Sequence, residues 1–380
     1  MAKRTHSGWG GIIVVAPVTA LLAALASWMV RRIAPESSGS AIPYVKTALR
    51  EGWAGNPLRI ITVKFVGGIM AIGGGLALGR EGPTIQIGAA IGHLLGKTFR
   101  QNDNDRRVLL AAAAGAGLAT AFNAPIAGAV FVLEELVGQF DVTISIVTLG
   151  TSAGAIGIAQ LLLGRDADFV VPMLAQLDVG NLWSHFVLGF VFGRFGRRLL
   201  SRDPGDDRAA NSPEPNRRGM ARGRRRRHHR FIGMVCPRPD RCGDILTQQV
   251  LSGTALFSAI AVIFLIRFVL GPLSYSAQTP GGLFAPMLTI GSQAGLLMGW
   301  LWIRLFHSSM FLPQEFAIVG MAAFFTSVVR APVTVIILVI ELTGSSSSLL
   351  LPMLAASFTA MSVATFLKQP PIYSSLRVIR

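Results

Sequence analysis

The sequence predicts an all-α integral membrane protein in which many short, broken helices form two related halves. Three observations predict this class. Hydrophobic residues make up 51% of the 380 residues and charged residues only 14%, whereas soluble domains carry about 25% charged residues. Several apolar runs are long enough to cross a membrane. Glycine and proline interrupt many of these runs, and parts of the pattern recur later in the chain.

Four apolar runs reach the length of roughly 20 residues that a helix needs to cross about 30 Å of hydrocarbon. A basic pair, Arg31 and Arg32, directly follows the first run. That run is too long for the apolar part of a signal peptide, so we expect a retained helix. A soluble protein with buried helices would need polar faces, which these runs lack. The four runs are Gly11–Val30, Leu251–Leu270, Phe316–Ile340 and Leu349–Leu367.

One feature of the first half recurs clearly in the second half. Asn123-Ala-Pro-Ile precedes an apolar run that ends in Glu134, and Arg330-Ala-Pro-Val precedes an apolar run that ends in Glu341. Both ends of this feature are offset by 207 residues. Paired, interrupted apolar segments in two halves of a chain are typical of transporters whose binding site lies near the middle of the membrane.

The segment between the halves has a different composition. Residues 194–241 contain 15 arginines, no lysine and five acidic residues, so they carry +10 of the net charge of +16. We therefore divide the chain into a first half (1–195), a linker (196–242) and a second half (243–380). The linker is a disordered basic loop, a patch that binds nucleic acid or anionic lipid, or the product of a shifted reading frame. We favour the shifted frame, because the apolar pattern that begins near Trp183 stops abruptly after Phe195.

The segment Gly79-Arg-Glu-Gly-Pro places an acidic side chain, Glu81, inside an apolar region. Pro83 suits the first turn of a helix, where its missing N–H costs no hydrogen bond, so Glu81 should lie at a helix N-terminus. Such an end offers free N–H groups and about half a positive charge, which attract anions. An ionisable residue within a membrane is a candidate functional residue. We expect the Glu81 carboxylate to occupy an anion site itself and to leave that site when it is protonated or displaced. The alternative is that Glu81 forms a buried ion pair with Arg80.

Three other features carry groups that can donate hydrogen bonds to an anion. In Gly39-Ser-Ala-Ile-Pro, the hydroxyl of Ser40 either binds an anion or caps its own helix, and the motif alone favours capping. The segment Gly282-Leu-Phe-Ala-Pro resembles the Glu81 segment, from which its proline is offset by 203 residues. Tyr373 follows two prolines and, taken alone, is typical of an anchor at the membrane interface.

Other functions find little support in the sequence. The ending Gly96-Lys-Thr lacks the first glycine of a phosphate-binding loop, because Ile91 stands in its place. Two cysteines form neither a disulfide framework nor a zinc site, and the adjacent histidines His228 and His229 lie in the linker. No nucleophile stands beside a base. We therefore expect no enzyme, no metal and no cofactor.

Together these motifs resemble the three signature motifs of the CLC family of chloride channels and chloride–proton antiporters. The resemblance covers residues 11–195 and 243–379. It implies the CLC-type fold, in which two repeats of inverted topology contain many short, broken and tilted helices. It also implies a homodimer with one pore in each subunit. The motif positions are Gly39, Ser40, Ile42 and Pro43; Gly79, Arg80, Glu81, Gly82 and Pro83; and Gly282, Phe284 and Pro286.

The resemblance also implies roles for individual residues. The hydroxyls of Ser40 and Tyr373 would hold a central chloride ion, together with the backbone N–H groups of Leu283 and Phe284. Glu81 would be the gate: it would compete with chloride and carry protons on the outer side.

In antiporters of the family a second glutamate passes protons from the inner side, and Glu135 matches it better than Glu134. The internal repeat supports this choice. Glu134 has Glu341 as its repeat partner, which indicates an architectural role, whereas Glu135 has Leu342 at the equivalent position. The alternative is that Glu135 is a carboxylate at a helix end on the cytoplasmic surface.

We predict a multi-pass protein of the inner (plasma) membrane of a bacterium that exchanges chloride for protons across the lipid bilayer and binds no nucleic acid. Two alternatives stay open: a passive, voltage-gated chloride channel, and a truncated or frameshifted product without activity. The sequence departs from the family pattern in three ways. Ala41 replaces the usual second glycine of Gly-Ser-Gly-Ile-Pro, helices that usually precede the first apolar run are missing, and no nucleotide-sensing (CBS) domains follow the second half.

Overall fold

The computed structural model describes residues 9–164, 169, 171, 182–200, 242–254, 256–306, 312–344 and 347–376. These residues form helices and connecting segments, and they contain no β-strand beyond two isolated bridges. The first half comprises α1 (Trp9–Ile33), α2 (Ala41–Glu51), α3 (Pro57–Gly73), α4 (Glu81–Thr98), α5 (Asp103–Phe122), α6 (Pro125–Phe131) and α7 (Val142–Leu163). The remaining helices are α8 (Trp183–Leu200), α10 (Cys242–Leu251), α11 (Phe257–Ser276), α12 (Phe284–Phe306), α13 (Pro313–Val329), α14 (Pro332–Thr343), α15 (Leu350–Phe366) and α16 (Ile372–Ser375).

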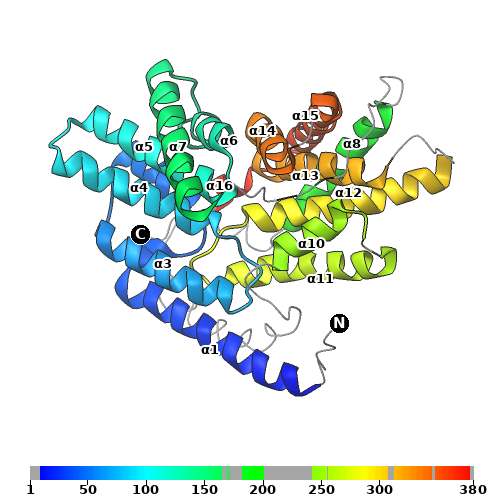
Figure 1. Cartoon of the computed structure of the whole chain (residues 1–380), viewed down its shortest axis with the longest axis horizontal. Helices are drawn as coiled ribbons and strands as arrows, with labels where there is room; N and C mark the ends of the chain where they lie inside the picture. The colour runs from blue at the N-terminus through cyan, green and yellow to red at the C-terminus, as the bar shows by residue number, and fades with distance from the viewer. Residues whose placement is uncertain are drawn as a thin grey trace, which may run out of the picture.

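The two halves lie side by side. Helices α1 to α7 occupy one side of the molecule and α10 to α15 the other, with the short α16 between them (Figure 1). Helix α16 contacts both α2 and α13, so it touches both halves. Helix α8 packs against α13 and α15 of the second half.

The internal repeat is visible in how two helices end. Helix α5 ends before Asn123 and α13 ends before Arg330, and both residues adopt the left-handed conformation, with φ angles of 49° and 73°. Two residues later a proline begins the next helix, Pro125 in α6 and Pro332 in α14. The residue before a proline is disfavoured in a helix, so the chain breaks at the same place in each repeat. The apolar run Phe316–Ile340, which has the length of a span, therefore forms two helices, α13 and α14, that are separated at the Arg330-Ala-Pro motif.

Two further boundaries differ from the sequence-based expectation. The run Leu251–Leu270 begins at the last residue of α10, and the helix that follows, α11, extends from Phe257 to Ser276. Helix α8 continues past Phe195 to Leu200, since arginine and leucine are both good helix formers even where the apolar pattern stops. The rest of the linker, residues 201–241, lies outside the described residues, and so does its interpretation as a frameshift.

Glycines allow two equivalent helix pairs to pack closely. A methyl group at Gly88 or Gly92 of α4 would overlap backbone carbonyls of α5, and one at Gly117 of α5 would overlap α4. In the second half, Gly291 of α12 and Gly320 of α13 face each other. Small residues are the usual means of close helix packing in membranes, where lipid is as apolar as the side chains and no hydrophobic effect drives helices together.

Among the described helices, α7 and α11 are long and apolar enough to cross a membrane, judged by length and composition. Shorter apolar helices are α13, α14 and α15. Both long helices expose most of their apolar side chains; Leu161 and Leu163 of α7 are 85% and 86% exposed. Soluble monomers rarely expose contiguous apolar patches of more than a few hundred Å². These exposed faces agree with the predicted integral membrane class.

Candidate functional site

The glycine-containing motifs meet at the junction between the two halves. Gly79 and Gly282 exchange both of their backbone hydrogen bonds, each with an N···O distance of 2.9 Å. The N–H of Gly39 donates to the carbonyl of Thr279 at 3.2 Å, and the carbonyl of Gly39 accepts from Gly281 at 3.4 Å. Backbone hydrogen bonds thus bring the starts of α2, α4 and α12 together, although these helices are far apart in the sequence.

Glu81 is the first residue of α4, but its carboxylate lies at the N-terminus of α12. Its Oε1 accepts hydrogen bonds from the backbone N–H groups of Phe284 at 2.7 Å and of Ala285 at 3.2 Å. The side chain is 1% exposed, and its Oε2 has no hydrogen-bond partner. A methyl group at Gly79 or Gly282 would overlap the Glu81 carboxylate at its present position, so the two glycines leave room for it there. The carboxylate occupies the place where a helix N-terminus binds an anion.

Two buried hydroxyls at this junction lack hydrogen-bond partners. Ser40 immediately precedes α2, but its side chain makes no capping hydrogen bond, so the capping role that the motif alone favours is wrong. Tyr373 on α16 is 2% exposed, and it is therefore not the interfacial anchor that its sequence context indicates. Neither hydroxyl oxygen has a partner. A buried polar group without a partner costs about 1–3 kcal/mol, and a bound anion would remove that cost.

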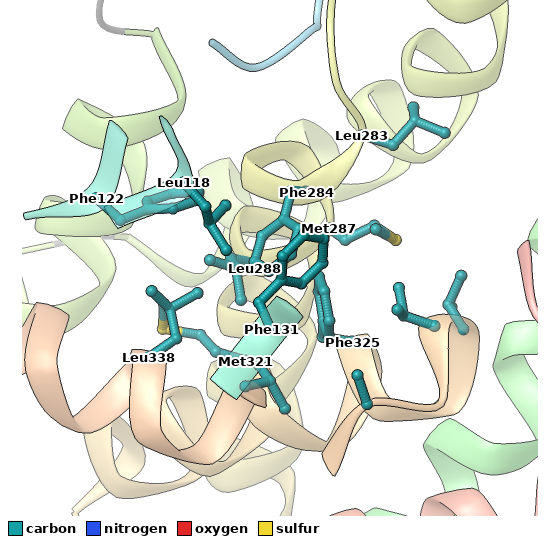
Figure 2. Close-up of a cluster of buried hydrophobic side chains, with 14 of the residues drawn as sticks. Leu118, Phe122, Phe131, Leu283, Phe284, Met287, Leu288, Met321, Phe325 and Leu338 are labelled. Atoms are coloured by element: carbon teal, nitrogen blue, oxygen red, sulfur yellow. The ribbon is translucent and has the colours of Figure 1, made fainter. Parts of the chain in front are cut away.

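The ring of Phe284 fixes the N-terminus of α12. Its centroid lies 4.2 Å from that of Phe325, 5.3 Å from that of Phe122 and 6.0 Å from that of Phe131. These rings come from α13, α5 and α6, so both halves contribute to the cluster, whereas Leu283 lies apart from it (Figure 2). Tilted and edge-on ring pairs add about 0.5–1.5 kcal/mol each to the effect of burial. The cluster thereby holds the backbone N–H of Phe284 in place for the anion site.

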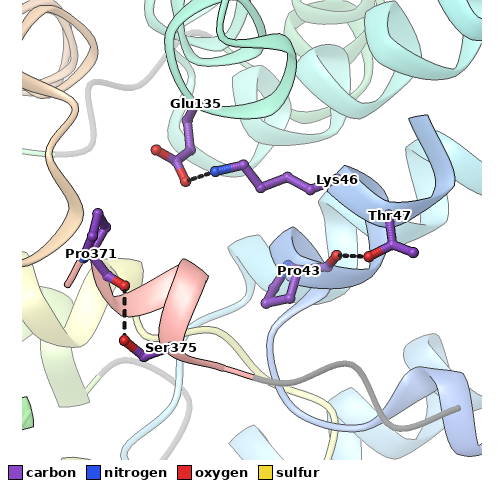
Figure 3. A network of polar contacts seen from close by, with 6 residues as sticks. All are labelled: Pro43, Lys46, Thr47, Glu135, Pro371 and Ser375. Carbon is purple, nitrogen blue, oxygen red and sulfur yellow. Dashed lines mark hydrogen bonds and ion pairs between the residues drawn. The ribbon is translucent and has the colours of Figure 1, made fainter. Parts of the chain in front are cut away.

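Glu135 lies in a π-helical turn, Val132–Val137, that directly follows α6. Its Oε1 accepts from Nζ of Lys46 at 2.6 Å, and the side chains of Glu135 and Lys46 are 7% and 23% exposed. Lys46 belongs to α2, which begins next to Ser40, and α16 lies close by (Figure 3). Turns of this kind are frequent at functional sites. Glu135 is therefore part of a largely buried ion pair and is not an exposed carboxylate at a helix end.

The neighbouring Glu134 has a different environment, which it shares with its repeat partner Glu341. Each of these carboxylates accepts hydrogen bonds from two backbone N–H groups at the start of a helix in the other half. The donors are Val333 and Thr334 of α14 for Glu134, at 3.1 and 2.6 Å, and Ile126 and Ala127 of α6 for Glu341, at 3.0 and 2.7 Å. This reciprocal capping agrees with an architectural role for both residues.

The arrangement can bind a small anion and can hold protons on two carboxylates. Buried hydroxyls and N–H groups at a helix start are donors that suit an anion. Helix α16, which carries Tyr373, contacts α2, and Lys46 of α2 binds Glu135, so Glu135 lies near the helix that carries Tyr373. Within the described residues, no group of three or more histidine, cysteine, aspartate or glutamate side chains is placed to bind a metal ion.

Sequence reasoning missed four residues around this site. Lys46 pairs with Glu135, and the N–H of Ala285 binds Glu81. Lys64 is completely buried, and Tyr275 accepts a hydrogen bond from the backbone of Ser40. Lys64 is a charged residue inside the apolar part of α3, beyond Arg59 in the first turn, and such a position points to function. Nothing in the sequence around Tyr275 distinguishes it from an ordinary apolar helix residue.

A family model described as voltage gated chloride channel matches residues 22–201 and 230–365 of the chain. The unmatched stretch between these two segments falls within the linker. A protein from Vibrio parahaemolyticus serotype O3:K6 named H(+)/Cl(-) exchange transporter ClcA is 37% identical over 372 residues. A protein of the same name from Vibrio campbellii is 36% identical over 372 residues. Both alignments cover 94% of this chain and 78% of the relative.

Solved structures give the same result. A slow cyanobacterial Cl⁻/H⁺ antiporter superposes with a TM-score of 0.84 at 32% identity, covering 96% of this chain and 86% of that chain. A eukaryotic CLC transporter superposes with a TM-score of 0.73 at 25% identity, covering 98% of this chain and 66% of that chain. The family and the fold class predicted from the motifs are confirmed. The chain belongs to the voltage-gated chloride channel (CLC) family of integral membrane proteins.

Proposed function

We propose that this protein moves chloride across a membrane in exchange for protons and that Glu81 is its gate. The position of the Glu81 carboxylate carries the proposal. It accepts hydrogen bonds from the N–H groups of Phe284 and Ala285, which are donors that a chloride ion would bind. A carboxylate in the anion's place must leave before an anion can pass. Protonation removes the charge that holds it there, so one side chain links anion movement to proton movement.

The remaining donors of the junction complete the proposed chloride site. Ser40 and Tyr373 contribute buried hydroxyls that have no other partner. The N–H group of Phe284 donates to Glu81 at the same junction, and the N–H of Leu283, the residue before α12, is a further proposed donor. The relatives from Vibrio and the cyanobacterial protein are named for the exchange of chloride and protons, which supports chloride as the anion. The activity is transport, and the proposal requires no catalytic chemistry.

Glu135 is the proposed inner proton carrier. It is buried, it lies near the helix that carries Tyr373, and it lacks the capping role of its neighbour Glu134. The bacterial relatives support a location in the inner (plasma) membrane of a bacterium. We also propose that the protein is a homodimer. The exposed apolar face of α7 would contact either lipid or the second subunit.

The Glu81→Gln variant tests the proposal. Glutamine keeps the shape of the side chain but cannot carry a negative charge, so it holds the N–H groups of α12 less strongly and cannot carry a proton. We expect chloride efflux from liposomes to continue and the accompanying proton movement to fall by at least about tenfold. Both are measured together, with a chloride electrode and a pH electrode. If the wild-type protein moves chloride without protons, the protein is a passive channel and the exchange mechanism is wrong.

A further inference from the structure

The peptide group between Gly39 and Ser40 is held at both of its polar ends. Its carbonyl oxygen, on Gly39, accepts a hydrogen bond from Nζ of Lys64 at 2.7 Å. Its N–H, on Ser40, donates to the hydroxyl of Tyr275 at 3.2 Å. Lys64 comes from α3 and Tyr275 from α11, so each half of the protein supplies one of these two contacts.

Lys64 is a buried amine, and it donates a hydrogen bond to a neutral group, the carbonyl of Gly39. Its side chain is 0% exposed, and among the described residues no carboxylate forms an ion pair with it. Burial of an ammonium group without an opposite charge is expensive. A negative charge nearby would reduce that cost, and the region around Ser40 is where the transported anion is proposed to bind. Occupancy of that site and the charge of Lys64 therefore stabilise each other.

Tyr275 has a hydrogen that is still available. A phenol both accepts and donates, and Tyr275 uses its oxygen to accept from the N–H of Ser40. No acceptor for its O–H is present among the described residues. The hydroxyl lies close to Ser40, from whose backbone N–H it accepts a hydrogen bond. Gly39 adopts a left-handed conformation, with φ of 58°, and a methyl group there would lie 2.9 Å from the Tyr275 oxygen. The backbone is thus shaped around this phenol.

We propose that Lys64 and Tyr275 determine the affinity and selectivity of the Ser40 anion site. Lys64 turns the Gly39 carbonyl away from the anion and supplies a compensating positive charge. Tyr275 holds the N–H of Ser40 and presents its own O–H as a third hydroxyl donor beside those of Ser40 and Tyr373. The inference rests on the proposed function of that site as a chloride site.

The test compares Tyr275→Phe with the wild-type protein. Chloride binding to the full chain in detergent is measured by titration calorimetry, and the ratio of chloride to nitrate flux is measured in liposomes. Loss of one hydrogen bond to an ion should weaken chloride binding by about tenfold. The flux ratio should fall as well, because the compact charge of chloride depends more on hydroxyl donors than the delocalised charge of nitrate.

Tyr44→Phe is the matched control, since Tyr44 is another largely buried tyrosine, and its hydroxyl donates to the carbonyl of Ala54. It should keep the chloride affinity and the flux ratio of the wild type. Lys64→Met should weaken chloride binding by more than Tyr275→Phe does; if Lys64→Met does not fold, Tyr275→Phe decides alone. Equal affinity and selectivity in Tyr275→Phe and the wild type would overturn the inference. A wild-type protein that binds no chloride would instead overturn the proposed function.

Discussion

Glu81 and Glu135 are both buried, but the groups that hold them differ. Glu81 is held by neutral N–H groups of α12, which stay in place when the carboxylate leaves and can then bind another anion. Glu135 is held by the ammonium group of Lys46, which reaches it from α2. The site of Glu81 therefore fits the proposed competition with chloride, and Glu135, whose carboxylate does not lie at a helix start, stays the proposed proton carrier.

Replacement of Glu135 by glutamine should separate the two transported ions. Glu135→Gln removes a proton carrier but leaves Ser40, Glu81 and Tyr373 unchanged. We expect proton movement in liposomes to fall by at least about tenfold, with chloride movement maintained. Glu134→Gln is the adjacent control and should keep proton movement, because Glu134 only caps α14. Undiminished proton pumping by Glu135→Gln would show that protons take another route.

For individual residues, the sequence was a better guide to the members of the site than to their hydrogen-bond partners. The motifs placed Glu81 at a helix start, and the structure agrees. The sequence could not show that its carboxylate reaches the start of α12, because that contact depends on the backbone pairing of Gly79 with Gly282. The sequence also favoured Ser40 as a helix cap, because the motif shows that Ser40 precedes a helix. It does not show the residues from the other half that surround Ser40 in the fold.

Individual helices are joined across the two halves by a pair of carboxylates. Glu134 caps α14 and Glu341 caps α6, so each half stabilises a helix start in the other. Removal of a cap that accepts two N–H groups should cost about 2 kcal/mol. We expect Glu134→Ala and Glu341→Ala to lower the thermal unfolding temperature in detergent by similar amounts. The ratio of protons to chloride should stay unchanged in both variants.

The comparison of the two variants is the sharper part of this test. If one substitution destabilises the protein and the other has no effect, the reciprocal capping does not contribute as proposed. If either variant loses proton coupling, its carboxylate takes part in transport, and the assignment of Glu135 as the special member of the pair is wrong.

Helix ends were predicted well where they depend on local chemistry. Pro83 was expected in the first turn of a helix, and it is the third residue of α4. Hydropathy alone does not show where the apolar run Phe316–Ile340 divides into α13 and α14, because it does not respond to the left-handed backbone of Arg330. Exposure was also not predictable: α13 is almost wholly buried, whereas the equally apolar α11 is largely exposed. Only packing against other helices separates these two cases.

At the scale of the whole molecule, residues from both halves meet at the proposed chloride site. Ser40 and Glu81 come from the first half, and Leu283, Phe284 and Tyr373 come from the second. The internal repeat predicted this organisation, because equivalent motifs occur at nearly constant offsets. It could not predict how the halves face each other, which depends on the backbone pairs between them and on the mixed cluster around Phe284.

A chain divided between the halves should work only when both parts are present. We expect residues 1–200 or 242–380, expressed alone in a membrane, to move no chloride, since neither contains both Glu81 and the α12 N–H groups that it binds. Co-expression should restore chloride efflux, because the hydrogen bonds between Gly79 and Gly282 join the parts without a covalent link. The co-expressed pair carrying Glu81→Gln should retain chloride efflux and lose proton movement.

Chloride efflux from one half alone would contradict a site built from both halves. If the co-expressed pair is inactive while the intact chain is active, residues 201–241 are needed for assembly.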